Sequence, residues 1–234
     1  MKGGPGPLDT VVVVPVLRRP HRIAPFLDSL AAATPETHRA VFVASDGDAA
    51  TIAAVLEFAD GDPLVSLEVL APNRAGDYAK KCNHVYRTSS EPFLFLAADD
   101  LAFHDRWLHH ALELMADPVA GVVGTQDLAP TARAKAGEHS THCLVRRRYV
   151  DELGTIDTPG RVLHEEYPHE YVDDELVGTA KARGAWRFAE LSIVEHLHPS
   201  WGKAPMDALY RQQRRRMDEG RRIFARRRAL WEAK

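Results

Sequence analysis

The N-terminal half of the chain alternates two hydrophobic periodicities, and this alternation limits the folds that it can adopt. Continuous apolar runs predict strands buried on both faces, at residues 10–17, 40–44, 64–70, 92–97 and 121–124. Apolar residues at helical spacing predict helices between them, at residues 23–33, 49–59, 78–88 and 105–115. Strands and helices in alternation predict an α/β fold, with a mostly parallel sheet flanked by helices.

The composition is that of an ordinary globular protein. The 234 residues fit one large domain, or one domain with an appended helix. Apolar residues make up 45% and charged residues 27%, which excludes a disordered or fibrous protein. The net charge of −3 argues against a protein that binds nucleic acid over its whole surface. Cys82 and Cys143 are too few for a disulfide framework or a cysteine-based zinc site.

Neither a membrane span nor a signal peptide is indicated. The longest apolar runs have about seven residues, whereas a spanning helix needs about 18–20. The first ten residues lack the apolar core of a signal peptide. We therefore expect a soluble, cytoplasmic protein.

The C-terminal half is less regular. Residues 129–140 are polar and rich in small residues, and they predict a mobile loop. A strand is predicted at residues 141–145, a short helix at 146–153, a helix at 171–183 and an extended segment at 186–196. A long helix is predicted from residue 205 to the end.

Ligands of such sheets bind beyond the carboxyl ends of the strands, which here are residues 15–19, 45–48, 72–76 and 98–100. None of these segments carries a GxGxxG or GxxxxGK[ST] motif, so neither a dinucleotide fingerprint nor a Walker loop is indicated. One of them delivers two adjacent carboxylates, Asp99 and Asp100, directly after a buried strand. Buried carboxylates need a cation, and oxygen ligands suit Mg²⁺ or Mn²⁺, which commonly hold a diphosphate. From the residues alone, a helix cap and a solvated aspartate remain an equal alternative.

The ordered segments resemble the family 2 glycosyltransferases of the GT-A fold. The resemblance extends over residues 10–200. It rests on the first strand with its exit (11–20), the turn at 45–48, the Asn-x-x-Gly…Asn segment at 73–83, and the Asp99-Asp100 pair. It continues through the strand and helix at 144–154, the acidic helix start at 171–176 with its later Gly184, and the late histidines at 195–198. Each motif is loose, but their common order is specific.

This resemblance implies a Rossmann-like GT-A domain that transfers a sugar from a nucleoside-diphosphate donor, such as a UDP-sugar, to an acceptor hydroxyl with inversion. It implies a divalent ion, Mn²⁺ or Mg²⁺, held by Asp100 and His196, with His198 as the competing ligand. Because the two histidines lie two apart on an extended segment, we expect their side chains on opposite faces. The residues that it implies for nucleotide-sugar binding are Pro15, Val16, Arg18, Asp46, Asn73, Gly76, Lys81, Asp99 and Lys203.

The general base implied by the resemblance is Asp173, with Asp174 and Glu175 as competitors one and two residues away. Three positions depart from the family pattern, since Ser45, Ala97 and Val172 stand where acidic residues are usual. We assign residues 1–204 to the glycosyltransferase domain, with a nucleotide-sugar half (1–125) and an acceptor half (126–204). Residues 205–234 form the arginine-rich helix.

That helix combines two signals. Residues 211–230 contain nine arginines, with Asp218 and Glu219 as the acidic residues. Tyr210, Met217, Phe224 and Trp231 recur every seven residues, which predicts packing against the domain's own flank or against a second subunit in a homodimer. The outward arginines would suit nucleic acid, an anionic membrane or an acidic acceptor.

Two other classes of function remain open. A nucleotidyltransferase shares the nucleotide-binding layout, although residues 15–20 lack the glycine-rich loop of that class. A non-catalytic module that binds a nucleotide sugar or an anionic polymer would explain the altered turn at Ser45. The acceptor itself is not assigned: glycan, lipid-linked, protein and modified nucleic acid acceptors, including DNA, are all compatible with the sequence.

Overall fold

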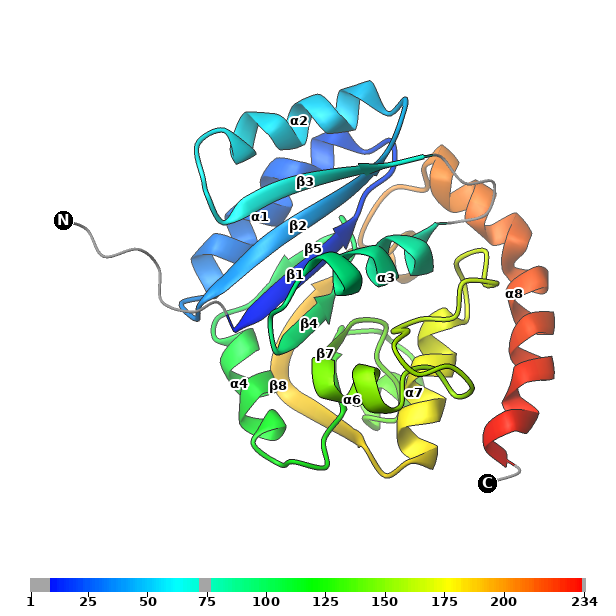
Figure 1. Cartoon of the computed structure of the whole chain (residues 1–234). Helices are drawn as coiled ribbons and strands as arrows, with labels where there is room; N and C mark the ends of the chain where they lie inside the picture. The colour runs from blue at the N-terminus through cyan, green and yellow to red at the C-terminus, as the bar shows by residue number, and fades with distance from the viewer. Residues whose placement is uncertain (1–8, 72–76, 233–234) are drawn as a thin grey trace.

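A computed structural model describes residues 9–71 and 77–232 (Figure 1). Asn73 and Gly76 lie outside the described residues. The strands are β1 Thr10–Pro15, β2 His38–Ser45, β3 Val65–Leu70, β4 Phe93–Leu96, β5 Leu101–Phe103, β6 Val122–Gln126, β7 Cys143–Arg146 and β8 Trp186–His196. The helices are α1 Ile23–Ala33, α2 Ala49–Ala59, α3 Tyr78–Thr88, α4 Trp107–Met115, α5 Ala132–Lys135, α6 Arg147–Glu152, α7 Val172–Ala182 and α8 Ala208–Glu232. Short 3-10 helices lie at Pro20–Arg22 and Pro199–Trp201.

Within the described residues, the strands form one sheet in the order β3-β2-β1-β4-β7-β6-β8-β5. The half of the sheet around β1 is parallel, because β1 pairs with β2 and β4, and β2 pairs with β3. In the other half, β7 runs antiparallel to β4 and β6, while β8 runs parallel to β6 and antiparallel to β5. The predicted α/β fold is confirmed, with antiparallel pairs confined to the second half.

The sheet is buried on both faces, as its β-branched strands predict. In β1, Val12 and Val14 belong to the apolar cluster of α1, α2 and α4, whereas Val11 and Val13 belong to the cluster of α3, α6 and α7. All four valines are fully buried. Successive side chains of a strand point to opposite faces of the sheet. Because the four valines of β1 are apolar on both faces, helices cover the sheet on both faces.

Three local predictions differ from the structure. Residues 101–103 form β5, which was not predicted, because a three-residue strand is defined by its partner β8 rather than by its own pattern. Residues 129–140 contain the short helix α5, whose first turn is capped by the Thr131 hydroxyl accepting from the Ala134 N–H at 3.3 Å. The long C-terminal helix begins at Ala208 rather than at residue 205.

Helix α8 packs on the flank of its own domain, beside α7 (Figure 1). Ile223 is buried in the apolar cluster of α7, and the ring of Phe224 contacts Tyr171 and Trp231. A Cβ on Gly220 would lie 2.6 Å from the Glu170 carbonyl oxygen, so the two backbones meet closely there. The apolar stripe of α8 therefore packs against the domain of the same chain.

One arginine of this helix points inward, contrary to the expected outward face. Arg227 is 6% exposed and donates to Glu175 Oε2 at 2.7 Å and to both carboxylate oxygens of Asp157 at 2.9 Å. The Tyr167 hydroxyl also donates to Glu175 at 2.8 Å. Buried charges require such partners, and here they join α8 to α7.

No helix within the described residues is both long and apolar enough to cross a membrane. The cytoplasmic location stays a prediction.

Candidate active site

A cavity of about 540 Å³ opens at the carboxyl ends of β1, β2 and β4. The start of α7, the end of β8 and the first turns of α8 complete its walls. The cavity is lined by these residues singled out from the sequence: Pro15, Val16, Arg18, Asp46, Lys81, Asp99, Asp100, Asp173, His196 and His198. Polar strand exits far apart in the sequence therefore share one space, as the topology of a parallel sheet requires.

Glu175, the more distant competitor for the base, does not line this cavity and pairs with Tyr167 and Arg227 instead. Lys203 and Asp174 do not line it either. The Lys203 ammonium lies 2.9 Å from Glu195 Oε1 and donates to the Leu128 carbonyl at 3.3 Å. Asp174 accepts from Arg133 Nη1 at 3.0 Å. Both side chains are engaged in ion pairs outside the cavity lining.

The Lys81 side chain supports the exit of β1. Its ammonium donates to the Val16 carbonyl at 2.9 Å and lies 3.2 Å from Asp77. Burial lowers the pKa of Lys81, while the Asp77 charge opposes this shift. The Ser45 hydroxyl also donates to Asp77, at 2.8 Å, so this contact joins the exits of β1 and β2 to the start of α3.

Asp99 and Asp100 are 5% and 3% exposed. Arg19 Nη1 donates to Asp99 Oδ1 at 3.0 Å and to Asp100 Oδ2 at 3.3 Å, and the Tyr210 hydroxyl also donates to Asp100 Oδ2. Burial and the adjacent charge of Asp100 raise the pKa of Asp99 to about 7. Burial would also raise the pKa of Asp100, but His196, Tyr210 and Arg19 hold it well below its usual range. Asp100 is therefore ionised at neutral pH.

His196 lies beside Asp100 because β5 and β8 pair with Leu101 opposite His196. His196 Nε2 is 3.4 Å from Asp100 Oδ1. Neither Asp100 Oδ1 nor His196 Nδ1, both buried, has a hydrogen-bond partner among the described residues. Burial lowers the pKa of His196, yet the neighbouring Asp100 more than compensates and raises it.

His198 corrects the expectation that the two histidines face opposite ways. The strand ends at His196, and the His198 N–H donates back to the His196 carbonyl at 2.8 Å. This turn brings the two ring centroids to 5.1 Å, and both residues line the cavity. His198 Nδ1 accepts from the Ser200 N–H at 3.2 Å and caps the 3-10 helix. Burial and the charge of His196 lower the pKa of His198 to about 4.

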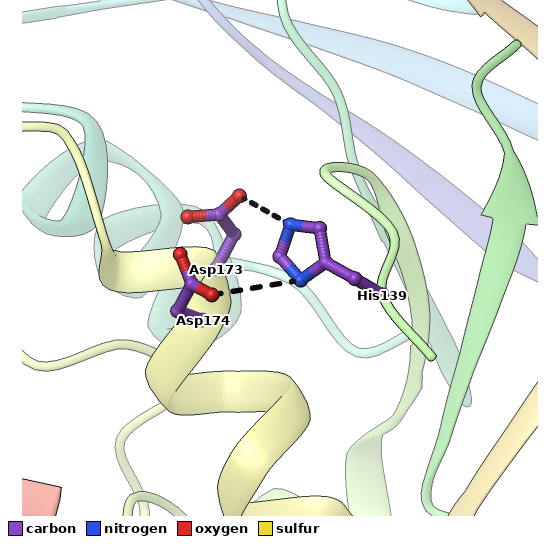
Figure 2. A group of neighbouring side chains, drawn as sticks. All are labelled: His139, Asp173 and Asp174. Carbon is purple, nitrogen blue, oxygen red and sulfur yellow. Dashed lines mark ion pairs between the residues drawn. The ribbon is translucent and has the colours of Figure 1, made fainter. Parts of the chain in front are cut away.

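Figure 2 shows the second carboxylate pair, at the first turn of α7, with His139 facing it from the segment after α5. His139 Nε2 is 3.2 Å from Asp173 Oδ2, and His139 Nδ1 is 3.8 Å from Asp174 Oδ1. One ligand atom from each residue lies within 4.8 Å of the others, a spacing that would also admit a cation.

The pKa values within this group move in opposite directions. Burial raises the pKa of Asp173, but the hydrogen bond and charge of His139 outweigh it and lower the pKa. Burial and the Asp173 charge raise the pKa of Asp174. Burial lowers the pKa of His139, and its two carboxylate neighbours raise it overall. Asp173, which lines the cavity, is thus ionised at neutral pH.

The family model described as "Glycosyl transferase family 2" matches residues 11–175, more than half of the chain. The chain belongs to this family. The match covers β1 to the start of α7, and so it includes both carboxylate pairs. A search of curated protein sequences finds no match.

Solved structures share the GT-A fold of this family 2 chain. A mannosyltransferase from Pyrobaculum calidifontis, in complex with GDP-Man and Mn²⁺, aligns with a TM-score of 0.63 at 18% identity over 81% of this chain. S. aureus TarS 1–349 with UDP-GlcNAc aligns with a TM-score of 0.61 at 14% identity over 85%. Glucosyl-3-phosphoglycerate synthase from Mycobacterium tuberculosis, with Mn²⁺, UDP and phosphoglyceric acid, aligns with a TM-score of 0.60 at 15% identity over 96%. The chain spans 57%, 62% and 78% of these three proteins, respectively.

Three residues of the site were missed from the sequence. Arg19 directly follows Arg18, which was a candidate for donor binding. Its charge at a strand exit could have indicated a functional role. Tyr210 was assigned to the apolar stripe of α8, although it heads that stripe and reaches Asp100. His139 lies in the segment interpreted as a mobile loop, and no local sequence pattern marks it as a functional residue.

Proposed function

We propose that this chain is a metal-dependent glycosyltransferase that moves a sugar from a nucleoside-diphosphate donor to an acceptor hydroxyl. The observation that carries the proposal is one cavity lined by an ionised carboxylate–histidine pair, Asp100 and His196, and by a second ionised carboxylate, Asp173. The Asp100–His196 pair is suited to binding a cation, and the Asp173 carboxylate is suited to accepting a proton. The family assignment and the sugar nucleotides in the aligned structures support this interpretation.

The residues present fit a divalent ion at the exit of β4. Asp100 Oδ1 and His196 Nε2 converge at 3.4 Å, and Asp100 Oδ1 is a buried oxygen without a hydrogen-bond partner among the described residues. A carboxylate oxygen with an imidazole nitrogen suits Mn²⁺ better than Mg²⁺. When bound there, the ion would stabilise the negative charge on the departing diphosphate. The Mn²⁺ in two of the aligned structures supports this choice of ion.

The donor nucleotide would lie along the exits of β1 and β2, where Pro15, Val16, Arg18 and Asp46 line the cavity. A UDP-sugar is our first choice of donor, and GDP-sugars are the next, because both occur in the aligned structures. Lys81 shapes this wall through the Val16 carbonyl.

Asp173 would act as the general base. In an inverting displacement, the acceptor oxygen bonds to the anomeric carbon while the bond from that carbon to the diphosphate oxygen breaks. The acceptor proton passes to the Asp173 carboxylate, and the diphosphate leaves with the bonding electron pair. The lowered pKa of Asp173 keeps its carboxylate ionised and ready to accept this proton.

The test is nucleotide release from a panel of UDP- and GDP-sugars with Mn²⁺, Mg²⁺ or chelator. We expect metal-dependent turnover with at least one donor. Absence of turnover with binding of a nucleotide sugar would favour the non-catalytic module. Release of pyrophosphate from a nucleoside triphosphate and a sugar phosphate would instead favour a nucleotidyltransferase.

The metal's location has its own test, because the His139 group is a second arrangement with suitable spacing. Mn²⁺ binding, followed by electron paramagnetic resonance, should weaken in His196→Gln and stay at the wild-type level in His139→Gln. The reverse result would move the ion to the start of α7.

A further inference from the structure

Arg19 is a buried cation whose side chain is fixed on three sides. It is 4% exposed and directly precedes the 3-10 helix Pro20–Arg22 at the β1 exit. There Arg18 adopts a left-handed backbone (φ 54°), and its N–H donates to Asp48 Oδ2 at 2.6 Å. Nε of Arg19 donates to Asp207 Oδ2 at 2.9 Å, and Nη1 donates to both Asp99 and Asp100. The ring of Tyr210 lies against the guanidinium, 4.0 Å from its central carbon.

The remaining nitrogen, Nη2, is buried and has no hydrogen-bond partner among the described residues. A guanidinium carries five N–H donors, two of them on Nη2, and leaving buried donors without acceptors is costly. Arg19 also lines the cavity. The cavity is therefore the place from which an acceptor for Nη2 has to come.

The surroundings favour an anionic acceptor. The guanidinium stays charged, because the carboxylates of Asp99 and Asp100 raise the pKa of Arg19 and outweigh the lowering by burial. The same cavity wall holds Asp100 and His196, the pair that fits a divalent ion. The two N–H groups on Nη2, beside such an ion, match a diphosphate, whose oxygens offer several charged acceptors.

We propose that Arg19 binds the diphosphate of the nucleotide donor through Nη2, and that helix α8 holds Arg19 in place through Asp207 and Tyr210. The proposal rests on the proposed function. In this role Arg19 supplies a fixed positive charge where the leaving group gains negative charge.

Helix α8 is then part of the donor site rather than an appendage. Asp207 accepts from Arg19 through one oxygen and from the Tyr210 N–H, at 2.8 Å, through the other. The Tyr210 hydroxyl reaches Asp100. The helix is anchored further along by Arg227 on Glu175 of α7. The position of α8 therefore fixes the orientation of the guanidinium.

The test compares the affinity of wild type and Arg19→Gln for UDP and GDP by calorimetry, with saturating Mn²⁺. We expect the dissociation constant of the bound nucleoside diphosphate to rise at least about tenfold. Binding of the matching nucleoside, uridine or guanosine, followed by ligand-observed NMR, should stay unchanged because it carries no phosphate. The matched control is Arg187→Gln, which removes an arginine ion pair with Asp117 outside the cavity lining and should leave both affinities unchanged.

A second variant keeps the test decisive if Arg19→Gln does not fold. Asp207→Asn retains an oxygen to cap the first turn of α8 but loses the charge that holds Arg19 Nε. We expect its nucleoside-diphosphate affinity to fall about threefold, with wild-type thermal stability.

Three results would overturn the proposal. One is a folded Arg19→Gln protein with wild-type diphosphate affinity, and another is unchanged affinity in a folded Asp207→Asn when Arg19→Gln does not fold. The third is an equal loss of nucleoside affinity in Arg19→Gln, which would assign the contact to the nucleoside. Failure of the wild type to bind any nucleoside diphosphate would instead refute the proposed function itself.

Discussion

Two pairs of adjacent aspartates, Asp99-Asp100 after β4 and Asp173-Asp174 at the start of α7, are neutralised in different ways. The side chains of the first pair are 6% and 4% exposed, and their shared partner is the permanently charged Arg19, while Asp100 also contacts His196. Those of the second pair are 25% and 17% exposed, and their shared partner is the titratable His139. A strand end buries its carboxylates, whereas a helix start exposes them to solvent and to the positive end of the helix dipole.

The two kinds of neutralisation suit the two pairs to different roles. Asp100, whose pKa is held well below its usual range by its neighbours, keeps its charge at ordinary pH values, which suits the binding of a metal ion. A carboxylate that lines the cavity beside a histidine can exchange protons. In each pair one pKa is lowered and the other raised, so the two members of a pair are not equivalent.

The largest expected effect comes from Asp173→Asn. Because asparagine cannot accept the acceptor's proton, we expect kcat to fall by about 10²–10⁴-fold. Mn²⁺-dependent nucleotide binding should remain at the wild-type level. Steady-state kinetics and calorimetry on one preparation check both parts. Full transfer in Asp173→Asn with loss in Asp174→Asn would shift the base by one residue.

Asp100→Asn and Asp173→Asn should differ in their effect on Mn²⁺-dependent nucleotide binding. Loss of the carboxylate charge should reduce turnover by about 10²–10³-fold, because the leaving group loses its stabilisation. Here nucleotide binding should also lose its dependence on Mn²⁺. Equal effects of the two variants on metal-dependent binding would contradict the division of labour between the pairs.

His139→Gln sharpens the comparison within the second pair. Glutamine still offers an N–H to Asp173 but no positive charge. Because His139 lowers the pKa of Asp173, its removal should raise that pKa. The acidic limb of the kcat profile should therefore move to higher pH, with at most about a tenfold loss near neutral pH. An unshifted limb would mean that His139 does not govern the ionisation of Asp173.

The smallest effect is expected at the anchor of α8. The Arg227 hydrogen bonds outweigh partial burial and lower the pKa of Asp157. A lowered carboxylate pKa stabilises the fold above the unfolded pKa, near 4, and this stabilisation is lost as the pH falls. Since the Asp157 side chain is 39% exposed, Asp157→Asn should cost only about 1 kcal/mol at pH 7.

Chemical denaturation of Asp157→Asn at pH 7 and pH 3 tests this expectation, because the difference from wild type should shrink at the lower pH. A difference that does not depend on pH would assign the effect to packing. Wild-type kinetics near neutral pH should accompany either result.

Much of the fold could be predicted from the sequence, because strand and helix periodicity is local. The apolar run at residues 11–14 identifies a central strand, and the run at 93–98 places Asp99 and Asp100 at a ligand edge. The residue-by-residue roles of the site are less accessible. His198 faces the cavity because the chain turns after His196, and a two-residue spacing contains no information about that turn. Lys203 looked equally eligible, yet its ammonium pairs with Glu195.

The α/β class, the edge of the sheet that carries the site and the two aspartate pairs can all be derived from local sequence, since each depends on neighbouring residues. The groups that neutralise these aspartates are brought to them by the packing of distant segments. Arg19 meets Asp99 across 80 positions of sequence, and Tyr210 meets Asp100 across 110. Periodicity describes which side of an element is apolar, but partners so distant are set by how the helices dock on the sheet.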